Sequence, residues 1–223
     1  SAFMNDQNQH LDTLKDIRQM MERSSRFISL SGLSGIAAGC CGLAGAWFAN
    51  GIIEANKFSD SSFNSTTDSR AVVVSVKDWM GNSLFQVAIF TFAAAFILAF
   101  LFTWIRSKKT NVPIWGSTAR RLMVQVLVPM AAGGIFLLAL MNSGAYGYIA
   151  PGCLIFYGIA VLNASKYTLP ETAYLGYAEI LLGIMSLFFI GNGLYFWAVG
   201  FGLFHIIYGL IMWRKYESGG DNK

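Results

Sequence analysis

The chain of 223 residues is 55% hydrophobic and only 13% charged, with a formal net charge of +4. Soluble globular domains carry about 25% charged residues, so this composition excludes a water-soluble domain of the same length and predicts a polytopic membrane protein. The positive charge does not indicate a nucleic-acid partner, because the basic residues gather at the edges of apolar runs rather than on one face. Membrane lipid is therefore the first predicted partner.

Residues 1–26 are polar and periodic. Leu11, Leu14, Ile17 and Met21 recur at helical spacing while charged residues take the opposite face, which is typical of an amphipathic helix. We expect this helix in the cytoplasm or at the membrane interface. Two interpretations stay open: a surface helix that leads into the first span, or a docking helix for another protein.

Six apolar runs follow, and each is close to the roughly 20 residues that a helix needs to cross the hydrocarbon core. The runs lack the alternation of barrel strands, so helices are the structure that satisfies their backbone polar groups in lipid. The sequence predicts an all-α, integral membrane six-helix bundle over 27–217, with an outer loop at 51–83 and a tail at 218–223. The spans are placed near 27–49, 84–105, 122–141, 146–164, 173–191 and 194–213.

Lys and Arg are distributed unevenly between the connections. One side of the predicted membrane carries the basic residues of the amphipathic segment, of the connection after the second span, of the turn after the fourth span and of the chain end. The other side carries only Lys57, Arg70 and Lys77, which acidic residues offset. Because cytoplasmic loops hold the excess of Lys and Arg, both termini are predicted to be cytoplasmic.

The first span contains the glycine-rich stretch SGLSGIAAGCCGLAGAW (31–47). Gly32, Gly35, Gly39 and Gly42 fall on one helix face at spacings of three and four. A face without side chains lets another helix approach closely, so we expect tight helix packing within the bundle or between protomers. A glycine-lined passage is the alternative.

Two ionisable residues interrupt the last two spans. Glu179 lies eight residues after Glu171, about 12 Å along a helix, and His205 lies nine residues before Arg214. Each is thirteen positions from Asn192, the centre of the intervening turn, so an antiparallel hairpin places the two side chains level. They are predicted to meet, because a lone carboxylate in hydrocarbon is costly.

Small residues flank both ionisable positions. Gly176 and Gly183 share the face of Glu179, and Gly202 and Gly209 that of His205, so the two stripes are predicted to pack face to face. Two interpretations of the ionisable pair stay open: a structural hydrogen bond, or a site that couples protons or anchors a ligand.

The hairpins 131–167 and 181–216 resemble each other and predict an internal repeat with parallel topology. The matched positions are Gly133 with Gly183, Asn142 with Asn192, and, after a one-residue shift, Tyr157-Gly158 with Tyr208-Gly209.

The sequence lacks the minimal residue set of most membrane enzymes, so it does not favour an enzyme. Cys40, Cys41 and Cys153 lie in apolar runs without CxxC or Cys/His spacing. We therefore expect reduced packing cysteines, with no metal and no cofactor.

Two stretches carry a resemblance: RSSRFISLSGLSGIAAG (23–39) and GFGLFHIIYGLIMWRKYE (200–217). They resemble a family of small polytopic membrane proteins of Bacteroidota, over nearly the whole chain. The resemblance implies a multi-pass protein of the inner (cytoplasmic) membrane and carries no activity.

Two classes of function remain at this point. The first is a module that binds or passes a small solute or a lipid, with Glu179 and His205 as its polar feature. The second is a non-catalytic scaffold or signalling component that docks through its amino-terminal helix. A homo-oligomer or another membrane protein is left open as a partner.

Overall fold

The structure is a computed structural model that describes residues 31–60, 81–110 and 115–218, with backbone only for 56–60 and Thr110. The predicted amphipathic helix, most of the predicted outer loop and most of the tail lie outside these residues. The helices are α2 (Gly32–Asp60), α4 (Ser83–Thr110), α5 (Ser117–Asn142), α6 (Ile149–Ala164), α7 (Glu171–Phe188) and a composite of α8 (Gly193–Trp197), the π-helical η2 (Ala198–Phe204) and α9 (His205–Tyr216), with a 3₁₀ turn η1 (Tyr146–Tyr148) before α6.

The described chain is all-helical, as predicted, and five helices are long and apolar enough to cross a membrane. The five candidate spans are Gly32–Ala55, Ser83–Lys109, Ser117–Asn142, Tyr146–Ala164 and Gly193–Tyr216. The helix outside this set is α7, which is also the helix that carries Glu171 and Glu179. Two carboxyl groups in 18 residues lower its mean hydropathy.

Several predicted span boundaries differ from the helix ends: α4 continues to Thr110 rather than 105, α5 begins at Ser117 rather than 122, and α9 continues to Tyr216 rather than 213. The first helix continues to Asp60, so residues 51–60, which were predicted as loop, extend the helix beyond the predicted end at residue 49. The fifth helix ends at Phe188 rather than at residue 191. Gly191 has φ 106° in the turn that follows, a conformation that glycine adopts at little cost, and this turn directs the chain into α8.

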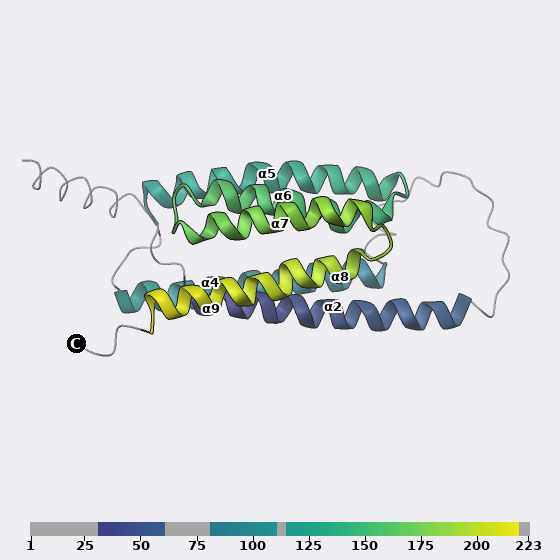
Figure 1. Cartoon of the computed structure of the whole chain (residues 1–223), viewed down its shortest axis with the longest axis horizontal. Coiled ribbons are helices and arrows are strands. Elements are labelled where there is room, and N and C mark those ends of the chain that lie inside the picture. The colour runs from purple at the N-terminus through teal and green to yellow at the C-terminus, as the bar shows by residue number, and fades with distance from the viewer. Residues whose placement is uncertain (1–30, 61–80, 111–114, 219–223) are drawn as a thin grey trace, which may run out of the picture.

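The helices form two groups of three (Figure 1). In one group α6 lies against both α5 and α7, and in the other α2 lies against α4 and against the η2–α9 segment. The groups meet where α8 and η2 contact α6 and α7. The last helix therefore belongs to one group and touches the other, which places its residues at the boundary.

A glycine seam joins α2 to η2 and α9, and we use this name for Gly32, Gly35, Gly39 and Gly42 with Gly202 and Gly209. A Cβ atom added at Gly39 would lie 2.6 Å from the carbonyl oxygen of Gly202, and one added at Gly209 would lie 2.5 Å from the backbone nitrogen of Ile36. Backbone meets backbone along this seam, so the predicted close packing of the first span is confirmed.

The predicted partners of the other stripes were wrong. A Cβ at Gly176 would meet the backbone of Leu162, and one at Gly183 would meet Ile155, so the α7 stripe packs against α6. The α9 stripe packs against α2 in the glycine seam. The two stripes do not face each other, because each packs against another helix of its own group.

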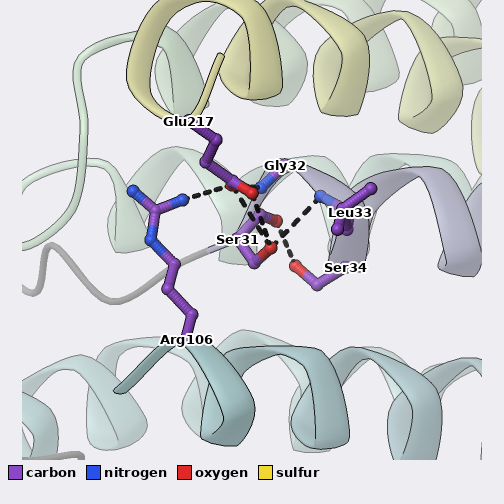
Figure 2. Close-up of polar contacts among 6 residues, drawn as sticks. All are labelled: Ser31, Gly32, Leu33, Ser34, Arg106 and Glu217. Carbon is purple, nitrogen blue, oxygen red and sulfur yellow. Dashed lines mark hydrogen bonds and ion pairs between the residues drawn. The ribbon is translucent and has the colours of Figure 1, made fainter. Parts of the chain in front are cut away.

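Three consecutive residues at the end of α9 tie both groups together. Lys215 and Tyr216 donate hydrogen bonds to the Glu171 carboxylate at the start of α7. The next residue, Glu217, accepts hydrogen bonds from Ser31 and from the Gly32 backbone N–H at the start of α2 (Figure 2). A negative group at a helix start satisfies free N–H groups and complements the helix dipole.

Arg106 of α4 completes this junction with an ion pair to Glu217 (Figure 2). Four helix ends therefore meet through side chains of one short segment. Burial alone would raise the pKa of Glu171, but its hydrogen bonds from Lys215 and Tyr216 outweigh this and the pKa lies below its ordinary value.

Candidate functional site

Glu179 and His205 are neighbours in the boundary between the two groups. The Oε1 atom of Glu179 lies 3.5 Å from Nδ1 of His205. Glu179 is 0% exposed and His205 is 6% exposed. The predicted proximity is confirmed, although the two stripes beside these residues face elsewhere.

The π-helical segment η2 sets the orientation of the His205 ring. Nδ1 of His205 lies 3.0 Å from the carbonyl oxygen of Gly200, five residues earlier and inside η2. A carbonyl oxygen only accepts hydrogen bonds, so Nδ1 carries a proton and donates it. Short π-helical turns are frequent at functional sites.

Tyr157 of α6 holds the other side of the ring. Its hydroxyl oxygen lies 2.6 Å from Nε2 of His205. Because Nδ1 carries the proton in the neutral ring, Nε2 is the acceptor and Tyr157 donates. Phe201 packs near both rings, with its centroid 5.0 Å from that of Tyr157 and 6.1 Å from that of His205.

Gly200 also makes space for the Glu179 carboxyl group. A Cβ atom at Gly200 would lie 2.5 Å from Oε2 of Glu179, closer than two such atoms can approach. Neither carboxyl oxygen has a hydrogen-bond partner among the described residues. The hydroxyl of Ser186, two turns further along the same buried face of α7, is likewise unpaired there.

A chamber of about 380 Å³ lies between the two groups, and Tyr157 and His205 form part of its wall. The wall is almost wholly apolar. Glu179 does not line the chamber but lies directly behind His205. Tyr157, His205 and Glu179 therefore form a row of polar groups that leads from the chamber to a buried carboxyl.

The chamber is partly open. One side of it is formed by Phe92 and Phe96 of α4, and the facing side by Met130 and Gly134 of α5. These two helices are not among the pairs that pack closely against each other. Residues of α4 and α5 therefore line the same chamber without close packing between the two helices.

Two kinds of site residue were missed by the sequence analysis. The sequence did mark Tyr157, because the internal repeat matches it to Tyr208. Both tyrosines form hydrogen bonds between helices, and the Tyr208 hydroxyl lies 3.0 Å from Thr172 Oγ1. Glu217 and Arg106 had none, because basic and acidic residues at helix ends are ordinary in any membrane protein.

The repeat itself is only partly reflected in the packing. Helices α5 and α6 form a closely packed hairpin, whereas α7 packs mainly on α6 and the last helix crosses to the other group. Of the cysteines, which form no disulfide, Cys40 is exposed on α2 and Cys153 lines the chamber.

Comparison with known protein families, with curated proteins and with solved structures finds no match for this chain. The resemblance to Bacteroidota membrane proteins stays a prediction. The function is argued below from the geometry of the chamber and its wall.

Proposed function

We propose that this multi-pass membrane protein binds a small lipophilic molecule or a single lipid chain in the chamber between its two helix groups. The observation that supports this most strongly is the chamber itself: its wall is apolar except for a few groups, and the Tyr157–His205 pair is among them. Ligand sites of membrane bundles and soluble proteins share this plan, with a mostly apolar wall and few polar groups that fix orientation.

The size of the chamber limits the ligand. At about 30 Å³ for each water-sized group, 380 Å³ holds roughly a dozen such groups. The chamber therefore encloses one hydrocarbon chain or one ring system. We propose that such a ligand enters between α4 and α5, which do not pack closely against each other, by a path from the bilayer that avoids water.

We place the protein in the inner membrane with both termini in the cytoplasm. The basic residues at the ends of α4 and α9 and at the start of α5 support this orientation, because these helix ends lie at the same end of the bundle. An excess of Lys and Arg is typical of the cytoplasmic side.

Trp197 lines the chamber and serves as a reporter. A brominated alkane of about ten carbons, added to the protein in nanodiscs of unbrominated lipid, should quench the Trp197 emission at low occupancy. Subtracting the signal of the Trp197→Phe variant isolates this residue from the other tryptophans.

Gly134→Leu and Gly51→Leu are matched test and control variants. Both glycines are helical, and a Cβ atom at either one meets nothing within 4 Å. Gly134 lines the chamber and Gly51 does not. We expect Gly134→Leu to fill the chamber and weaken the quenching of Trp197 at least tenfold in probe concentration, whereas Gly51→Leu leaves it unchanged. Equal quenching in both variants contradicts the proposed function.

A further inference from the structure

We propose that Tyr157, His205 and Glu179 form a relay that recognises an acceptor oxygen on the bound ligand, and that the ligand is therefore a lipophilic molecule with a carbonyl, ether or similar oxygen rather than a pure hydrocarbon. This inference rests on the proposed function. It concerns which ligands the chamber selects and how the wall responds.

In the structure the hydrogen bonds of the relay are donated away from the chamber. Tyr157 donates its only O–H to Nε2 of His205, at 2.6 Å, and His205 donates its N–H to the Gly200 carbonyl, at 3.0 Å. Glu179 is left with two oxygens that have no hydrogen-bond partner among the described residues. A buried polar group without a partner destabilises the fold, because its lost contact with water is not replaced.

A second arrangement of the same three side chains satisfies this carboxyl group. If His205 carries its proton on Nε2 instead of Nδ1, Nε2–H donates to the Tyr157 oxygen and Nδ1 accepts from a protonated Glu179. The gap of 3.5 Å between Oε1 and Nδ1 closes to hydrogen-bond distance when the ring turns from the Gly200 carbonyl towards the carboxyl group and the two atoms approach by roughly 0.5–0.8 Å. The Gly200 carbonyl loses its ring partner in exchange.

The second arrangement frees the Tyr157 O–H. That proton then points to whatever acceptor the chamber offers, because Tyr157 is part of its wall. An acceptor oxygen on the ligand therefore favours the second arrangement, and a hydrocarbon does not. The N–H bond at Nδ1 is broken and one at Nε2 is formed by exchange with water, which takes the proton from Nδ1 and returns one to Nε2, so Glu179 and His205 together hold the same number of protons before and after.

Glu179 acts in this relay as a neutral acid. An ionised carboxylate could not donate to Nδ1, and it would be a buried charge without a hydrogen-bond donor, which is strongly unfavourable. Gly200 contributes by leaving the carboxyl group room beside the ring. Glu179 is thus a positioning residue that reaches the ligand through two other side chains.

The test uses two probes of equal chain length, 2-undecanone, which has an acceptor oxygen, and undecane, which has none. The chain contains only two histidines, so ¹⁵N-histidine labelling of the His10→Gln variant leaves the His205 ring as the one signal. Its nitrogen shifts report which ring atom carries the proton. Competition with the brominated alkane shows independently whether each probe occupies the chamber.

We expect undecane to leave the proton on Nδ1 and 2-undecanone to move it to Nε2. Glu179→Gln should keep this response, because the amide N–H can donate to Nδ1, and Glu179→Leu should lose it. If both probes compete for the chamber but give the same His205 signal, the relay is wrong while the proposed function stands. If neither probe competes, the proposed function fails and the relay with it. Where Glu179→Leu does not fold, Glu179→Gln still tests the relay: a variant that binds 2-undecanone without moving the His205 proton contradicts it.

Discussion

The glycine seam allows a prediction whose size follows from the structure. In Gly39→Ala the new Cβ atom would lie 2.6 Å from the Gly202 carbonyl oxygen and 2.9 Å from the backbone nitrogen of Ile206, where ordinary contact begins at 3.4 Å. Both are backbone atoms and cannot turn aside. Helix α2 must therefore move away from the η2–α9 segment by nearly an ångström along this part of the seam.

The expected cost combines two terms. Overpacking of this kind costs about 1–3 kcal/mol, and replacing a helical glycine by alanine returns about 0.5–1 kcal/mol. We expect Gly39→Ala to lower the free energy of unfolding by up to about 2.5 kcal/mol on these two figures. Gly35→Ala should be close to neutral, because its nearest contact is the Cα atom of Gly209 at 3.0 Å.

Gly51→Ala is the control, since a Cβ atom there meets nothing within 4 Å. It should gain only the helix term and be slightly stabilised. Thermal unfolding of the three variants in one detergent, followed by circular dichroism, gives the order Gly51→Ala, Gly35→Ala, Gly39→Ala from most to least stable. If Gly39→Ala is as stable as Gly51→Ala, the seam faces lipid and the reasoning is refuted.

Three further predictions concern the Glu171–Lys215 contact, the packing of Glu179 against Gly200, and the orientation in the membrane. Glu171 has a lowered pKa, so its stabilising contribution is complete above the ordinary pKa of 4.5 and is lost as the pH falls through the pKa of the folded protein. The difference in melting temperature between wild type and Glu171→Gln should therefore shrink from pH 7 to pH 3. A difference that stays constant over this range would show that the pairing of Glu171 with Lys215 contributes nothing to stability. Gly200→Ala should destabilise the protein less in a Glu179→Ala background, with a coupling of about 0.5–3 kcal/mol in a double-mutant cycle, and strict additivity would place the carboxyl group elsewhere. Ser65→Cys in an otherwise Cys-free chain should react only with a thiol reagent applied outside the cytoplasm, and modification only from the cytoplasm would reverse the proposed orientation.

The helical class, five of the six predicted spans and the glycine seam could be predicted because they depend on local properties. An apolar run of a given length, or glycines at spacings of three and four, have the same meaning in any membrane bundle. The proximity of Glu179 and His205 also followed from a local quantity, since equal distance from a turn places two residues level whatever else surrounds them.

The sequence could not predict which helix faces pack against each other. Gly176 and Gly183 contact α6, not α9, because the choice among neighbouring helices depends on how the whole bundle is arranged. Tyr157 reaches His205 from a helix 48 residues earlier, and the π-helical turn that brings the Gly200 carbonyl to the ring leaves no recognisable mark in AVGFGLF (198–204). The chamber follows from the separation of α4 and α5, which no single helix encodes.

The most direct measurement for the proposed function is the identity of whatever lipophilic molecule the purified protein retains. Wild type and Gly51→Leu should carry the same oxygen-containing species with one chain or ring system, near one molecule per protein, by native mass spectrometry and extraction. Gly134→Leu should carry it at no more than a tenth of that level. An identical lipid content in all three proteins would show that the chamber does not hold a ligand.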